Sequence, residues 1–242
     1  LTTASLLASP AGAEPPRYRN FELAIYCRVD DVRRMAEGDW LEKTYAALAK
    51  DLKIGKVYLE THRSRVTNDR ETMLKVKRFF ESRGIKTAGG ITLVADEGRE
   101  FKQFSYTSPA DRKHVEEVVR FTASLFDELI LDDFFFTTTK TESDIQAKGT
   151  RSWSDFRLAL MREAAQSLVI GPAKAVNPKI KVVWDSAIEE IKDIAEGKVT
   201  SAVIKNLKNG ERTELPVGAV FVAIGHEPNT QLFKGVLELH DN

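Results

Sequence analysis

The feature that most constrains this chain is an alternation of short apolar runs with amphipathic segments, which begins at Phe21. Short apolar runs that alternate with helical patterns are typical of parallel strands joined by helical crossovers. The predicted strands are 21–27, 56–60, 85–90, 128–136 and 180–183, and the predicted helices are 38–53, 68–84, 108–126 and 152–169. The sequence therefore predicts an α/β fold built on a parallel sheet.

Two of the helices carry clear signals at their amino ends. Asn68 is followed three residues later by Glu71, which is the spacing of a capping box, and Gly84 marks the end of the same helix. Ser108 precedes Pro109, which suits an N-cap followed by the first helical position. We expect helices to begin at Asn68 and Ser108.

The alternation of apolar runs with amphipathic segments stops in the last quarter of the chain. Past Trp184, strand-like runs are joined by turns such as 208–210, and no helix longer than two turns is predicted. We therefore expect a domain boundary between Asn177 and Trp184, with one domain at 21–183 and a small, mostly β one at 184–242.

The first twenty residues, "LTTASLLASPAGAEPPRYRN", are predicted to lie outside both domains. Their small, apolar composition and the Ala-Gly-Ala before Glu14 resemble the end of a secretory signal peptide, and a disordered linker is the alternative. A signal peptide would place the protein in the periplasm or outside the cell. No apolar run is long enough to span a membrane.

Charge and cysteine content exclude several classes of function. The chain has 36 basic and 36 acidic residues, so electrostatics gives no case for a nucleic-acid partner. The single cysteine, Cys27, cannot form an intrachain disulfide, and no Cys/His spacing predicts a metal site. We expect Cys27 to be a small buried strand residue.

Polar side chains gather where the predicted parallel strands end. The predicted catalytic residues are Asp132, Asp133 and Glu60, and the predicted substrate-binding residues are Arg28, Asp30, His62 and Arg63. Strand ends of a parallel barrel face one site, and carboxylates gathered there suit hydrolysis of a glycosidic bond. The alternative is structural, because His62 and Arg63 can simply neutralise Glu60.

The first domain resembles a known family through "YCRVDD", "VYLETHR", "AGGITL" and "FDELILDDFFF". Over about 21–183 it is similar to the first half of a secreted, glycoside-hydrolase-like (β/α)8 barrel. The resemblance implies a partial barrel of four to five βα units and a glycan as partner. It also implies a catalytic acid at the end of the fourth strand, which points to Asp132 or Asp133.

The last segment, about 177–242, resembles thioredoxin reductase through "GKVTSAVIKNLKNGERTELPVGAVFVAIGHEPNT". The resemblance implies the end of an NADPH domain, the return into an FAD domain, and a cytoplasmic disulfide reductase in which Gly225, Pro228 and Asn229 lie near the flavin. A reductase also needs a Gly-x-Gly-x-x-Gly turn and a Cys-x-x-Cys pair, and neither occurs here. We therefore expect no cofactor, with FAD and NADPH bound only by a complete reductase.

These observations predict a chimera joined near 177–184, in which a partial barrel is followed by a reductase-like fragment. We expect an incomplete, inactive fusion whose larger part originates from a glycoside hydrolase. The alternative is an FAD- and NADPH-dependent disulfide oxidoreductase. The oligomeric state is not predicted.

Overall fold

The computed structural model describes residues 22–98, 101–132, 135–180, 182–183 and 185–217. The chain divides into two compact units, one through Asp185 and one from Ser186 onward. Asp133, Gly225, Pro228 and Asn229, which the sequence analysis named as site residues, lie outside the described residues.

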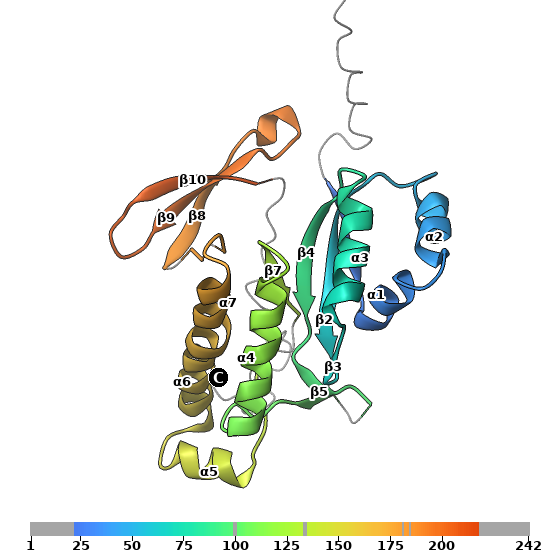
Figure 1. Cartoon of the computed structure of the whole chain (residues 1–242). Coiled ribbons are helices and arrows are strands. Elements are labelled where there is room, and N and C mark those ends of the chain that lie inside the picture. The colour runs from blue at the N-terminus through green and yellow to red at the C-terminus, as the bar shows by residue number, and fades with distance from the viewer. Residues whose placement is uncertain (1–21, 99–100, 133–134, 181, 184, 218–242) are drawn as a thin grey trace, which may run out of the picture. The chain divides into compact units, whose positions relative to one another are not determined.

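The first unit is built on a sheet whose main path is β1–β2–β4–β7, with every neighbouring pair parallel. These strands are β1 (Leu23–Cys27), β2 (Ile54–Arg63), β4 (Lys86–Ile91) and β7 (Leu129–Leu131). Two short hairpins extend from it, through β3 (Val66–Thr67) and through β5 (Val94–Asp96) with β6 (Lys102–Gln103). The predicted α/β fold with a partial-barrel sheet is confirmed (Figure 1).

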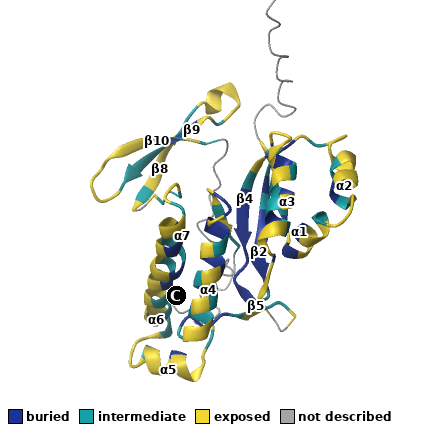
Figure 2. Ribbon diagram, in the orientation of Figure 1, coloured by how far each residue is buried: buried dark blue, intermediate teal, exposed yellow. Residues whose placement is uncertain are grey.

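The first four helices of this unit lie between its strands in sequence, and the other three follow its last strand. The helices are α1 (Val29–Met35), α2 (Trp40–Leu48), α3 (Arg70–Glu81), α4 (Pro109–Ala123), α5 (Glu142–Lys148), α6 (Trp153–Ala164) and α7 (Gly171–Val176), with a π-helical turn at Ala165–Ile170 between the last two. Figure 2 shows that the strands β2 and β4 are largely buried, whereas the helices carry an exposed outer face.

Two apolar clusters hold these helices on the sheet. The first joins β1 and β2 to α1, α2 and α3 through residues such as Val57, Leu59 and Val76. The second joins the end of β4 to α4, α6 and α7 through residues such as Ile91, Val119 and Leu168. Burial of these side chains is the main term that stabilises the unit.

Gly89 of β4 is required by this packing. A Cβ at this position would lie 2.4 Å from Thr122 Cγ2 and 2.8 Å from Phe126 Cδ2. Because only glycine leaves that space, α4 and the residues that follow it can lie directly against the strand. Thr122 and Phe126 are both buried.

The structure corrects two local predictions. The N-cap of α3 is Asp69, whose side chain accepts from the backbone N–H of Thr72, and not Asn68. Asn68 is buried and donates its amide to the carbonyl of Val29, so its side chain is committed to a tertiary contact. The predicted strand at 180–183 is also wrong, because its described residues, 180, 182 and 183, are not in a strand.

The second unit holds a three-stranded antiparallel sheet in the order β10–β9–β8. Its strands are β8 (Ser186–Ile191), β9 (Ser201–Asn206) and β10 (Arg212–Pro216), with a 3₁₀ turn at Ile194–Glu196. The expected turn between β9 and β10 closes at Gly210, which has a φ of +72°. The predicted small β region is confirmed.

Candidate active site

The candidate site lies where the parallel strands of the first unit end. The chain turns sharply after β2, because Ser64 and Arg65 both have left-handed backbone conformations with φ values of 50° and 58°. Two consecutive positive φ values are the geometry of a tight hairpin turn. This turn fixes Arg63 as the last residue of β2, so its side chain is directed among the ends of the neighbouring strands.

Arg63 is the centre of a buried polar network, which we call the Arg63 network. Its guanidinium donates to Glu60 through Nε and Nη2, at 3.0 and 2.9 Å, and to Glu97 through Nη1 at 2.8 Å. Nη2 also lies 3.2 Å from Asp132 Oδ2. Burial alone lowers the pKa of Arg63, but its hydrogen bond to Glu60 and the charges of Glu60, Glu97 and Asp132 raise it overall.

Glu60 is wholly enclosed within this network. Besides Arg63, it accepts hydrogen bonds from the hydroxyls of Tyr26 (2.9 Å) and Thr92, and from the backbone N–H of Val29 (2.6 Å). Its exposed fraction is 0%. A buried carboxylate needs this many donors, and the same donors leave it no free face toward solvent.

Asp132 stands immediately after β7 and is more accessible, with 28% of its side chain exposed. Its Oδ2 lies 3.1 Å from the hydroxyl of Thr92, which also contacts Glu60. A hydroxyl carries a single proton, so Thr92 donates to only one of the two carboxylates at a time. The hydrogen-bonding states of Asp132 and Glu60 are therefore linked through Thr92.

The other predicted residues divide into two groups. Arg28, at the end of β1, reaches the network because it donates to Glu97 at 2.9 Å. Asp30 does not reach it, since it lies exposed in the first turn of α1 and pairs with Arg33 at 3.6 Å.

His62 is buried beside the network and makes a different set of contacts. Its Nδ1 lies 2.9 Å from the Thr92 carbonyl and its Nε2 lies 3.0 Å from Nε2 of His114 on α4. A carbonyl only accepts, so Nδ1 carries the proton and His114 donates to His62. Burial lowers the pKa of His62 to about 4, and burial together with Arg65 lowers that of His114.

Sequence reasoning missed Glu97 and Tyr26. Glu97 follows β5 with 30% of its side chain exposed, and it bridges Arg28 and Arg63. Tyr26 lies in β1 next to buried Cys27, and burial with the charges of Glu60 and Asp132 raises its pKa. The alternation of sides along β1 could have placed Tyr26 on the face opposite Cys27, but nothing local indicated that Glu97 turns back toward Arg63.

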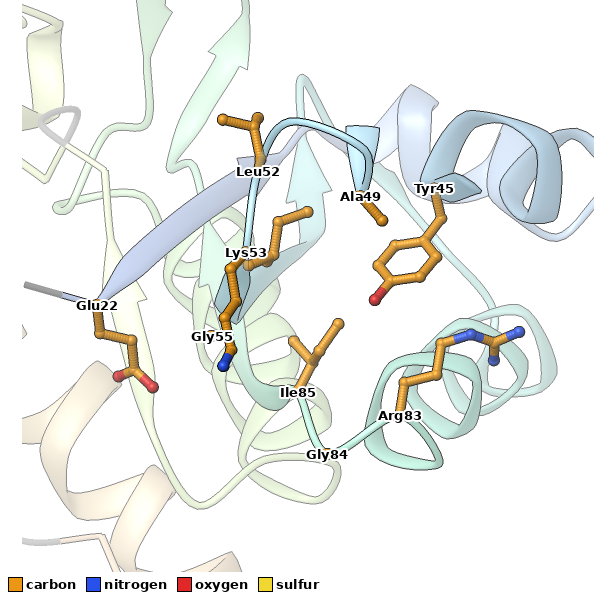
Figure 3. A pocket seen from close by; sticks show the side chains of 10 residues that line it. Glu22, Tyr45, Ala49, Leu52, Lys53, Gly55, Arg83, Gly84 and Ile85 are labelled. Carbon is orange, nitrogen blue, oxygen red and sulfur yellow. The ribbon is translucent and has the colours of Figure 1, made fainter. Parts of the chain in front are cut away.

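The opposite end of the sheet carries a cavity of about 770 Å³, bordered by Tyr45, Lys53 and Arg83 (Figure 3). Arg83 is already engaged, since its guanidinium lies 3.6 Å from the Phe79 ring centroid and donates to Glu42. The cavity gathers no set of carboxylates, so the Arg63 network is the better candidate site. Across the described part of the chain, no group of three or more His, Cys, Asp or Glu side chains is arranged to hold a metal ion.

A parallel sheet with helical crossovers, whose strand ends gather carboxylates around an arginine, is the architecture of part of a (β/α)8 barrel. Residues 11–185 match the family model described as "Probable glycosyl hydrolase, catalytic domain". The match spans more than half of the chain, and the chain belongs to this family.

Individual relatives match different lengths of the chain. An uncharacterized protein of Saccharolobus solfataricus is 30% identical over 192 residues, which cover 68% of this chain and 32% of that protein. The thioredoxin reductase of Streptomyces coelicolor is 46% identical over 63 residues, which cover 26% of this chain and 19% of that protein. The chain thus spans less than a third of the length of either relative, and its chimeric resemblance is confirmed.

Among solved structures, α-L-fucosidase isoenzyme 2 of Paenibacillus thiaminolyticus superposes with a TM-score of 0.50 at 11% identity. The superposition covers 68% of this chain and 32% of the fucosidase chain. At this identity the likeness concerns the fold alone. In the described ranges, no helix combines the length and apolarity that crossing a bilayer requires.

Proposed function

We propose that the first unit acts on a glycosidic bond at the carboxyl ends of its parallel strands, with Asp132 as the reacting carboxylate. The observation that carries this proposal is the contrast between two carboxylates of one network. Asp132 is partly exposed and ion-paired with Arg63, whereas Glu60 is enclosed by donors. Only Asp132 of the two can meet a sugar without breaking the network.

Glu60 then has a positioning role. Its contacts with Nε and Nη2 fix the plane of the Arg63 guanidinium, and that plane sets where Asp132 and Glu97 lie. This assignment differs from the sequence-based expectation that Glu60 is itself catalytic. It rests on burial, because a side chain with no exposed surface cannot contact a substrate.

Hydrolysis requires a second carboxyl group, which protonates the leaving oxygen while the first attacks or activates water. Asp132 is ion-paired and suits the role of nucleophile or base. We assign the acid to Asp133, which follows Asp132 directly and lies outside the described residues. Arg28 and Arg63 remain the proposed substrate-binding residues, because both border Glu97 at the accessible side of the network.

The proposal is tested with the full chain on a panel of aryl glycosides. Asp132→Asn should lower the rate on the best substrate by about 10²-fold or more, the scale of a positioned acid or base. Asp127→Asn is the matched control, since Asp127 precedes β7 at the other end of the strand and pairs with exposed Lys179. Equal rates in the two variants would rule Asp132 out as the reacting group.

A second candidate, an inactive fusion, rests on the two unrelated resemblances that the chain carries. This candidate predicts no turnover of any glycoside in the panel. It also predicts that Asp132→Asn and Asp127→Asn bind glycans equally well.

Disulfide chemistry receives no support from the described residues. Cys27 is buried against the helices, and burial with the charge of Asp31 raises the pKa of its thiol to about 12. A thiol that stays protonated at neutral pH is a poor nucleophile. The reductase alternative therefore rests on sequence resemblance, and a yellow flavin absorbance in the purified protein is the observation that would favour it.

A further inference from the structure

A group of cations surrounds one indole ring in the segment that follows Asp132. Nζ of Lys140 and Nζ of Lys148 each lie 5.5 Å from the Trp153 ring centroid, and Cζ of Arg157 lies 5.0 Å from it. We call these four residues the Trp153 cluster. Arg151 adds a further positive charge beside them, over the ring of Phe156 at 5.1 Å.

The cations of this cluster are not neutralised by the part of the chain that the structure describes. There, no carboxylate forms an ion pair with Lys140, Lys148 or Arg157. Lys148 and Arg157 instead donate to backbone carbonyls, of Gly149 and Thr138, each at 3.2 Å. The nearby acid Asp144 is committed elsewhere, because it accepts from the hydroxyl of Thr107 and from the backbone N–H of Thr141, the N-cap of α5. The three positive charges are gathered around one ring, and an anion bound among them would be attracted by all three.

Arg157 gives a second, independent indication. Its Nε is buried and has no hydrogen-bond partner. Buried N–H groups of a guanidinium are normally paired, since leaving one unpaired is unfavourable. Arg157 as a whole is only half-buried, so an anion can reach its guanidinium, although not the enclosed Nε itself.

The cluster lies at the same end of the first unit as the Arg63 network. Helix α5 and the start of α6 lie toward the end of the unit where β3 and β5 are found, beyond the carboxyl ends of β2 and β4 (Figure 1). The buried carboxylate of Asp144 ties α5 to Thr107, just before α4. A ligand held by the cluster would therefore be on the substrate side of the sheet.

We propose that the Trp153 cluster binds the anionic groups of an acidic glycan, so that the substrate carries carboxylate or sulfate groups. This inference rests on the proposed function, which supplies the glycan. A neutral sugar is disfavoured, because it would stack on the Trp153 ring and three cations already lie around that ring. The balanced charge of the whole chain disfavours nucleic acid, which requires an extended basic surface.

Binding to the full chain is measured with two probes that share one sugar backbone, oligogalacturonate and its methyl ester, in which each carboxylate is replaced by an uncharged ester. We expect the acid to bind about tenfold more tightly at low salt, since three charge contacts of modest strength add to that ratio. The ratio should fall toward one as salt screens the charges. Equal binding of the two probes at low salt would overturn the inference.

The variant Lys140→Gln/Lys148→Gln/Arg157→Gln should abolish the preference for the acid. The matched control, Arg33→Gln/Lys43→Gln/Lys75→Gln, removes the same charge from α1, α2 and α3 and should keep it. An equal loss of the preference in both variants would mean that the net charge of the protein causes it, and would contradict a binding site at the Trp153 cluster. Should the triple variant unfold, Lys140→Gln alone is used, because Lys140 is an exposed loop residue.

Two further experiments distinguish this inference from nucleic-acid binding and from the proposed hydrolysis. Tighter binding of duplex DNA than of oligogalacturonate would assign the cluster to nucleic acid and overturn the inference. Asp132→Asn should lose hydrolysis and keep the charge preference. If the wild type prefers the acidic probe but hydrolyses no glycan, the result supports the Trp153 cluster and contradicts the proposed function. If it hydrolyses neutral glycans but does not prefer the acidic probe, the result supports the proposed function and contradicts the cluster.

Discussion

Arg63 and Glu60, both on β2, form a buried ion pair. The Arg63 guanidinium donates hydrogen bonds to the Glu60 carboxylate through Nε and Nη2. Glu60 has no exposed surface and Arg63 has only 8%. The pair therefore behaves as one unit, whose members depend on each other for neutralisation.

The first prediction follows from this dependence. Arg63→Met should lower the free energy of unfolding by about 3–5 kcal/mol, because it leaves the Glu60 charge buried and unpaired. The double variant Glu60→Gln/Arg63→Met should recover a large part of that loss. Urea denaturation of Arg63→Met, Glu60→Gln and the double variant measures the difference, and additive losses would show that the residues are not coupled.

A second prediction concerns pH. His62 has an ordinary pKa near 6.5 when unfolded and about 4 when folded, so below pH 6.5 the unfolded state binds a proton that the folded state does not. The free energy of unfolding should be constant above that range and fall by roughly 3 kcal/mol between pH 6.5 and 4. His114 contributes in the same direction.

The matched measurement for this prediction uses His62→Gln. Carboxylates also titrate below pH 5, and the variant retains all of them, so the difference between the two stability curves isolates the histidine. The curve of the variant should be flatter between pH 6.5 and 5. Parallel curves over that interval would contradict the assignment of a depressed pKa to His62.

A third prediction concerns Gly90, which faces Tyr26. A Cβ at this position would lie 2.7 Å from the Tyr26 hydroxyl and 2.8 Å from its ring, so Gly90→Ala must displace the tyrosine from Glu60. We expect a loss of about 1–3 kcal/mol in unfolding free energy. Gly98→Ala is the control, because its Cβ would meet only Asp96 Oδ1 at 3.5 Å. Similar melting temperatures for the two variants would argue against close packing at Gly90.

A fourth prediction uses the single thiol as a probe of the core. Cys27 is buried, and its raised pKa leaves little thiolate at pH 8. Labelling by a thiol reagent should therefore be slow in buffer and rapid in denaturant. Complete labelling of native protein within the dead time of mixing would mean that β1 is not covered by α1 and α2.

The sequence was sufficient for the elements whose pattern is local. The alternation of apolar strands and amphipathic helices predicted the sheet, and Ser108 with Pro109 predicted the start of α4. Asn68 and Asp69 are both good N-caps, and the choice between them was made by the tertiary contact of Asn68 with Val29. Nothing near Asn68 in the sequence carries that information.

The site was predictable in part for the same reason. The strand-end pattern pointed to Glu60, Arg63 and Asp132. The sequence also allowed Arg63 to neutralise Glu60, and the structure contains this ion pair. The Glu97 contact depends on how the β5–β6 hairpin folds back, which no spacing reveals. His62 was expected beside Glu60, yet its ring bonds Thr92 and His114.

Asp132 is the residue on which the proposed hydrolysis depends most, and one measurement tests its role directly. The release of reducing ends from an acidic oligosaccharide is compared between the wild type and Asp132→Asn, with binding of the same oligosaccharide measured in parallel. We predict that the variant binds the oligosaccharide as the wild type does and releases reducing ends at least about a hundredfold more slowly. Equal rates in the two proteins, or no release by the wild type, would contradict a hydrolytic site at this carboxylate.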